Sequence, residues 1–363
     1  MRTIVITSTK PYTGKSSLAV ALITYLADRG LDVGYFKPYG TMPVTEGDLV
    51  TDEDALYVNR VVRRPSDLAD VCPVVRSQGL IETVLITGSA PIGPDHVRAA
   101  FDRCASDRDV MIVEGPTEPS QGTCVGLHAQ AVAELLDAPV LLIDRPRPTD
   151  LPEDALWVCE QLRDRLGGVV LNGVDESRLA VVRERVAPFL ERRGIPVFGV
   201  IGMDPTLGSV TVSDIVDALG GTVLTAPEAL EDTVESFMVG AMGQDKALRF
   251  FRRKANKAVI TGGDRADVQL AALETSTRCI VLTGNQLPGA TVMSRAEELG
   301  VPMVLVDTDT LTAVERMETL FGRIHLHDPV KAARIRTMFE RDVDIPRLLA
   351  AFGLEFATDQ GAR

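Results

Sequence analysis

Lysine is scarce in this chain. Of its 38 lysines and arginines, only seven are lysines. They are Lys10, Lys15, Lys37, Lys246, Lys254, Lys257 and Lys331. A compact ammonium binds phosphate as a point charge, whereas a guanidinium presents a planar fork. Three of the seven fall within the first 37 residues, which suggests a chemical requirement for lysine in this region of a chain that otherwise uses arginine.

Cysteine, histidine and long apolar runs are also sparse. The five cysteines are scattered and form no Cys-x-x-Cys pair, which disfavours a disulfide framework and indicates reduced thiols in a cytoplasmic protein. Four histidines disfavour a histidine-rich metal site. No apolar run approaches the roughly 18 residues that a membrane span needs, and no signal peptide precedes the first strand. We therefore expect no membrane partner.

The net charge disfavours two further classes of binding partner. The net charge is −13 at pH 7, which argues against nucleic acid and anionic membranes as partners. A length of 363 residues suits two or three domains, and 45% hydrophobic with 25% charged residues is ordinary for a globular protein.

The first seventeen residues carry the most information. An apolar strand runs into Ser8–Ser17, and residues 18–26 open a helix. Strand, turn, Gly-Lys-Ser and helix form the layout of a phosphate-binding loop, in which backbone N–H groups face an anion. The pattern predicts ATP, with Lys15 on the β- and γ-phosphates and the Ser16 hydroxyl on Mg²⁺. The other expected nucleotide contacts are Thr13, Gly14 and Ser17. The alternative is a strand–helix turn that happens to contain these residues.

The loop departs from the common form. Thr9 stands where the first glycine is usual, and Lys10 follows it. A second lysine here resembles the deviant loops of the MinD, nitrogenase iron protein and dethiobiotin synthetase group. The resemblance implies that Lys10 acts in turnover, across a homodimer interface that lies near the nucleotide. The alternative is an exposed loop lysine without a role.

Alternating elements predict the fold class. Continuous apolar strands alternate with helices, which indicates an α/β fold with a parallel sheet covered on both faces. We assign residues 1–225 to this first domain and expect less regular structure over 60–90. Thr51 is the expected N-cap of the next helix, and 176–193 is expected to form one helix. The same alternation continues in a smaller α/β domain over 226–328, followed by a helical segment and tail over 329–363.

Several segments together resemble dethiobiotin synthetase, and still more the dethiobiotin-synthetase-like N-terminal domain of long bacterial phosphate acetyltransferases. They are Ser8–Ser17, Gly34–Pro38, Asp52–Leu56, Val113–Gly115 and Val170–Asn172. Residues Lys257–Asp267 and Val281–Asn285 resemble a DRTGG domain. This resemblance implies a P-loop NTPase domain followed by a DRTGG domain. The residues that follow leave no room for an acetyltransferase domain, so we expect a stand-alone form without acetyltransferase activity.

The resemblance assigns further site residues. Glu114 ends a buried strand and is expected to hold Mg²⁺, as is Asp54, with Asp52 a close competitor. Lys37 matches the lysine that holds the substrate's anionic group, and Asn172 matches the asparagine that reads the nucleobase. The alternatives are a helix-capping acid, a first-turn acid, a strand-end lysine and a turn asparagine, respectively.

Three functions are compatible with these residues. The first is a regulatory ATPase whose DRTGG domain senses an unidentified small metabolite or contacts a partner. The second is an ATP-dependent ligase that acts on a small acid or amine through an acyl or carbamoyl phosphate. The third is a scaffold that does not hydrolyse ATP, which the intact loop disfavours. Segment 116–122 replaces the glycine-rich run of the synthetase, so diaminopelargonate is not the expected ligand.

Overall fold

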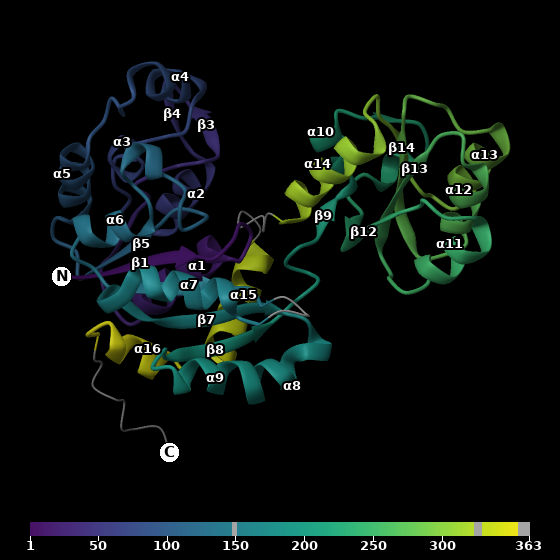
Figure 1. Ribbon diagram of the computed structural model, residues 1–363. Coiled ribbons are helices and arrows are strands. Elements are labelled where there is room, and N and C mark those ends of the chain that lie inside the picture. Colours follow the sequence, from purple (N-terminus) through teal and green to yellow (C-terminus); the bar gives the residue numbers. More distant parts are fainter. Residues whose placement is uncertain (147–150, 323–328, 355–363) are drawn as a thin grey trace. The chain divides into compact units, whose positions relative to one another are not determined.

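The structure is a computed structural model that describes residues 1–146, 151–322 and 329–354. The chain divides into two compact units, residues 1–203 with 326–363 and residues 204–325 (Figure 1). Across the described residues, helices are too short or too polar to cross a membrane.

A six-stranded parallel sheet forms the first unit, in the order β2-β5-β1-β6-β7-β8. The strands are β1 (Arg2–Ser8), β2 (Val33–Phe36), β5 (Val110–Glu114), β6 (Val140–Asp144), β7 (Leu166–Val174) and β8 (Val197–Gly202). β5 and β6 are buried along their whole length, as strands covered on both faces must be. The predicted α/β fold with a parallel sheet is confirmed. The loop after β1 lies between the carboxyl ends of β5 and β6, where open sheets bind ligands.

Most helices of the first unit cover this sheet, whereas α4 lies at the periphery of the unit (Figure 1). The helices are α1 (Lys15–Ala27), α2 (Glu53–Val61), α3 (Leu68–Val71), α4 (Gln78–Thr87), α5 (Pro94–Ala105), α6 (Ala129–Leu135), α7 (Glu153–Leu162), α8 (Leu179–Val181), α9 (Ala187–Arg192), α15 (Pro329–Asp342) and α16 (Ile345–Ala351). The C-terminal segment packs on the first unit, because Phe339 of α15 meets Tyr25 of α1 edge to face at 6.5 Å. The predicted tail, 355–363, lies outside the described residues.

Three local features differ from the sequence expectations. Residues 60–90, expected to be irregular, contain α4, and the hairpin β3 (Pro43–Glu46) and β4 (Leu49–Asp52) precedes α2. Asp52, not Thr51, caps α2, because its carboxylate accepts from the N–H groups of Asp54 and Ala55. The helix expected over 176–193 is interrupted by a π-helical turn at 182–186, just before Pro188, which has no N–H to donate to the helix.

The second unit has its own sheet, in the order β10-β15-β14-β13-β12, with only the edge strand β10 antiparallel. Its strands are β10 (Thr222–Val223), β12 (Ser236–Val239), β13 (Lys257–Gly262), β14 (Thr277–Thr283) and β15 (Met303–Leu305), and β9 (Val210–Thr211) pairs with β11 (Thr233–Val234) beside it. Its helices are α10 (Val212–Leu219), α11 (Gln244–Phe251), α12 (Ala266–Leu273), α13 (Ala290–Glu298) and α14 (Thr310–Gly322).

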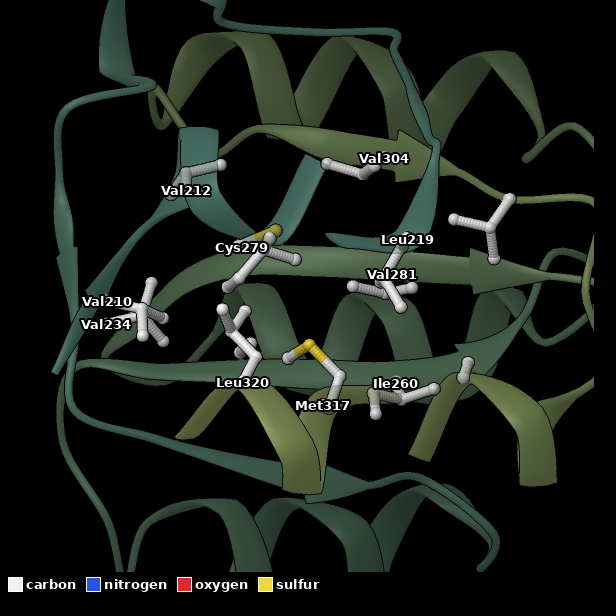
Figure 2. Packing of buried hydrophobic residues seen from close by; sticks show 14 residues of the cluster. Val210, Val212, Leu219, Val234, Ile260, Cys279, Val281, Val304, Met317 and Leu320 are labelled. Atoms are coloured by element: carbon white, nitrogen blue, oxygen red, sulfur yellow. The ribbon is translucent and has the colours of Figure 1, made fainter. Parts of the chain in front are cut away.

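Each face of the second sheet has an apolar core. Residues of α10 and α14 pack on one face, and residues of α11, α12 and α13 pack on the other. Figure 2 shows Cys279 and Val281 of β14 within the first core, with Leu219 of α10 and Met317 of α14. Because α10 belongs to this core, the unit boundary lies near residue 204 rather than at the predicted position between 225 and 226.

Candidate functional site

The loop between β1 and α1 is held against the end of β7. Gly14 has φ 91°, and a Cβ there would stand 2.4 Å from Nδ2 of Asn172. The same Nδ2 donates to the Thr13 carbonyl at 2.7 Å. Only glycine therefore fits at position 14 without moving the asparagine. The Thr13 hydroxyl is buried and has no hydrogen-bond partner among the described residues.

Side chains from three elements converge at the start of α1. The Ser16 hydroxyl lies 3.0 Å from Oδ2 of Asp54 in α2 and 3.0 Å from Oε1 of Glu114 at the end of β5. Glu114 is buried, and its other oxygen accepts a hydrogen bond from the Tyr35 hydroxyl at 2.9 Å. The structure thus brings together the three residues that the sequence predicts as metal ligands.

Lys37 lies in the same cluster, directly after β2. Its Nζ is 2.7 Å from Oδ1 of Asp52, 2.9 Å from Oδ2 of Asp54 and 3.3 Å from Oε1 of Glu114. Burial lowers the pKa of Lys37, but the three carboxylates outweigh burial and hold this pKa well above its ordinary value. Lys37 is therefore a buried cation surrounded by acids.

Lys15 is the other buried cation of the cluster. It is the first residue of α1, and burial lowers its pKa, although the nearby Glu114 carboxylate opposes this. Burial would also raise the pKa of Asp54, but the Lys37 ammonium and its hydrogen bond outweigh burial, and the pKa of Asp54 lies below its usual value. The pKa shifts of Lys37 and Asp54 therefore both favour the charged form, whereas burial of Lys15 acts against its charge.

Asp52 and Asp54 have different surroundings. One oxygen of Asp52 accepts from the N–H groups of Thr41 and Met42, and the other caps α2 and contacts Lys37. Asp54 instead shares Oδ2 between Ser16 and Lys37. The hydrogen bonds of Asp52 position the hairpin and the helix, so Asp54 is the acid that faces the loop serine.

Lys10 lies apart from this cluster. It forms an ion pair with Asp154 of α7. The neighbouring Thr9, which replaces the usual glycine, donates its hydroxyl proton to Oδ1 of Asp144 at 2.6 Å. Burial raises the pKa of Asp144, and this hydrogen bond opposes the rise. The two unusual loop residues therefore connect the loop to the end of β6 and the start of α7.

Sequence reasoning did not identify Tyr35 or Asp144. Both lie at or near the end of a strand, beside residues that it did identify. Tyr35 lies two positions before Lys37, so the side chains of Tyr35 and Lys37 point to one face of an extended chain. That spacing was the available signal for Tyr35. Asp144 ends an apolar strand in the same way as Glu114, which was the available signal for this acid.

The side chains at the loop suit Mg²⁺ when phosphate and water supply the remaining ligands. No group of three or more His, Cys, Asp or Glu side chains in the described part of the chain could hold a metal ion by itself. Two carboxylates and a serine hydroxyl do meet at the loop, and Mg²⁺ is commonly held by one or two carboxylates together with substrate phosphates and waters. The unpartnered Thr13 hydroxyl adds a polar atom in the same loop.

Two family models match parts of this chain. A family model described as an AAA domain matches residues 2–211, and one described as a DRTGG domain matches residues 214–320. A phosphate acetyltransferase of Pseudomonas aeruginosa is 28% identical over 372 residues, which cover 95% of this chain and 51% of that protein. A phosphate acetyltransferase of Synechocystis is 24% identical over 378 residues, with 95% and 51% covered.

The chain spans about half the length of the curated relatives that it matches. Among solved structures, the cell division ATPase MinD of Pyrococcus furiosus is similar over 57% of this chain and 85% of its own, with 22% identity and a TM-score of 0.36.

Proposed function

Since this chain belongs to the AAA domain family, we propose that its first unit binds ATP with Mg²⁺ at the Lys15 loop and hydrolyses it. The predicted combination of a P-loop domain with a DRTGG domain, related to phosphate acetyltransferases, is confirmed. We further propose that the second unit senses a small metabolite and regulates the first, in a homodimer.

One observation carries the nucleotide proposal. Ser16, the second residue of α1, has its hydroxyl 3.0 Å from both Asp54 and Glu114, and it follows the buried Lys15. On this proposal Lys15 contacts the β- and γ-phosphates, and backbone N–H groups at the start of α1 face the anion. Ser16, Asp54 and Glu114 would hold Mg²⁺, which neutralises phosphate charge when bound. The remaining contacts would come from Thr13, Gly14, Ser17 and, at the nucleobase, Asn172.

Calorimetric titration with Mg·ATP tests the loop assignment. Lys15→Ala removes a direct phosphate contact, so we expect at least a tenfold weaker affinity, the equivalent of about 1.4 kcal/mol. Lys254→Ala is the matched control, because Lys254 is exposed on the second unit. Equal affinities for the wild type and Lys15→Ala would contradict the assignment.

A second variant tests whether Glu114 binds the metal. Glu114→Gln keeps the shape of the side chain and removes its charge. We expect it to shift the Mg²⁺ dependence of ATP hydrolysis to higher concentration without weakening the binding of metal-free ATP. An unaltered Mg²⁺ titration of turnover would refute a metal-binding role for Glu114.

The regulatory part of the proposal rests on the DRTGG match and on the relation to phosphate acetyltransferases. Acetyl phosphate and acetyl-CoA are therefore the first probes, because both are reactants of an enzyme with that name. We expect at least one of them to change the rate of ATP hydrolysis without binding at the Lys15 loop. A rate unaffected by either probe would count against regulation by this class of metabolite.

The geometry favours the ATPase over the ligase. A ligase of the synthetase kind needs Lys37 free to hold an anionic substrate. Here its ammonium is already paired with the carboxylates of Asp52, Asp54 and Glu114, at 2.7, 2.9 and 3.3 Å. ADP formation that required both bicarbonate and a small amine would support the ligase instead.

A further inference from the structure

One apolar helix of the first unit buries little of its surface against the described residues. Helix α4 has the sequence QGLIETVLIT, and none of its ten residues is buried. Leu85 and Ile86 are 80% and 83% exposed, and Ile81 is also exposed. Figure 1 shows α4 at the periphery of the first unit, away from its sheet. Contiguous exposed apolar side chains of this kind mark an interaction site.

A helix of this length needs packing to be stable. Isolated helices shorter than about 12–15 residues are marginal in water, and most helices are stabilised by burying one face. α4 has caps at both ends, since the Ser77 hydroxyl accepts from the Leu80 N–H and Gly88 ends the helix in the left-handed conformation. Caps alone do not provide the missing burial, so a further apolar surface is expected to cover this helix.

The chain leading into α4 holds the helix in a fixed place. Arg76 donates its backbone N–H to the Gly40 carbonyl at 2.9 Å, and the Gly40 N–H donates to the Val74 carbonyl at 2.8 Å. Residues 74–76 therefore lie beside the segment that connects Lys37 to the hairpin. The apolar side chains of α4 are thus presented outward from an anchored base.

We propose that α4 packs against α4 of a second copy of this chain, in a symmetric homodimer. The inference rests on the homodimer of the proposed function and names its interface. It does not require Lys10 or bound nucleotide.

Charge is the first argument for a second copy. The chain carries a net charge of −13, so two copies repel each other wherever their acidic surfaces meet. Residues 77–94 contain a single charged side chain, Glu82. An uncharged apolar surface is where two acidic molecules can approach closely. The absence of lysine and arginine from this stretch also disfavours an anionic lipid surface as the partner.

Self-complementarity is the second argument. Ile81 and Leu85 are one helical turn apart and form a ridge on the surface of α4. A two-fold axis between them places Ile81 against the partner's Leu85 and repeats the same contact on the other side. Stable interfaces bury roughly 800 Å² on each partner. Residues 77–92 supply the apolar centre of such an interface, and the half-buried Leu80, Val84 and Ile92 widen it.

Sedimentation velocity tests the interface. We expect the wild type to form a dimer of two 39.2-kDa chains at micromolar concentration. The double variant Leu85→Glu/Ile86→Glu should be a monomer, with dimer affinity lowered at least a hundredfold. Both side chains are exposed, so the variant should fold, and circular dichroism and the fluorescence of Trp157 check this. The matched control is Leu311→Glu on the second unit, where Leu311 is 69% exposed.

Each other outcome has a defined meaning. A monomeric wild type, or a double variant that remains a dimer, would overturn the proposal. Flotation of a monomeric wild type with phosphatidylcholine vesicles would assign the face to a lipid surface and would overturn it as well. Mg·ATP affinity measured on the same samples keeps the two proposals separate, because loss of the dimer with unchanged affinity tests only the interface.

Discussion

Replacing Lys37 by methionine should destabilise the first unit in a pH-dependent way. The substitution keeps most of the side-chain volume and removes the ammonium from three carboxylates that lie within 3.3 Å of it. Asp52 and Glu114 are almost completely buried. Removing one partner of a buried ion pair costs roughly 3–5 kcal/mol, because the remaining charge stays desolvated. Lys15 remains beside Glu114, so we expect the lower end, about 3 kcal/mol at pH 8.

The pH dependence follows from the direction of the pKa shifts. In the wild type the pKa of Asp54 is below its usual value, because Lys37 outweighs burial. Its stabilising effect is therefore present above the unfolded pKa of about 3.9 and is lost only as the pH falls through the lowered value. Between pH 5 and pH 8 this cluster should leave the stability of the wild type nearly constant.

The variant should behave in the opposite way. Without Lys37, burial and repulsion from the neighbouring carboxylates raise the pKa of Asp54 above its unfolded value. The folded state then binds more protons than the unfolded state, so stability falls as the pH rises through this range. If the pKa is one unit higher in the folded variant than in its unfolded state, protonation at low pH restores about 1.4 kcal/mol of the free energy of unfolding. The loss should accordingly shrink from about 3 kcal/mol at pH 8 to about 1.5 kcal/mol at pH 5.

Urea unfolding followed by tryptophan fluorescence measures this difference. The single tryptophan of the chain, Trp157, lies in α7 of the first unit and reports on that unit. Lys254→Met is the control, because this exposed lysine lies on the second unit. A loss below about 1 kcal/mol, or an equal loss at pH 5 and pH 8, would refute the argument that Lys37 compensates buried charge.

Three further changes have defined outcomes. Gly14→Ala should weaken Mg·ATP binding at least tenfold by calorimetry, because its Cβ would displace Asn172, and an unchanged affinity would show that the loop can relax. Lys10→Ala should lower the rate of ATP hydrolysis on the order of a hundredfold without changing the dissociation constant, whereas equal rates would leave Lys10 only as the partner of Asp154. Burial lowers the pKa of Lys257 to about 8, so the wild type should gain stability as the pH rises from 8 towards 10. Calorimetry of Lys257→Met should show no such gain, and a gain equal to that of the wild type would refute it.

The parallel sheets were predictable because their strands must be apolar throughout. Residues 110–113 and 140–143 form continuous apolar runs of strand length, which are typical of strands covered on both faces. The hairpin over 43–52 gave no such signal, because its first strand is short and largely exposed. Helix α4 was missed for a related reason. Its apolar residues lie on more than one face, so the stretch lacks the one-sided apolar pattern that predicts a surface helix.

The domain boundary shows a different limit. Residues 212–219 fall within the segment 1–225 that the alternation of strands and helices assigned to the first domain. In the structure Val212, Ile215 and Leu219 instead pack into the core of the second sheet. A helix with one apolar face fits either sheet equally well, so its sequence does not reveal which core it joins.

The sequence indicated which residues form the candidate site, but not how their positive and negative charges pair. The loop motif and the strand-end acid indicated Lys15, Ser16 and Glu114, and the structure places them together with Asp54. The sequence could not show that Lys37 shares the oxygens of Asp54 and Glu114, because that depends on where two separate strands end. With Asp52, the cluster holds three carboxylates against two ammonium groups, one net negative charge. Such a site repels a polyphosphate that arrives without a counter-ion. If ATP binds here as proposed, the divalent cation contributes to affinity as well as to turnover, since it supplies positive charge that the side chains of the cluster lack.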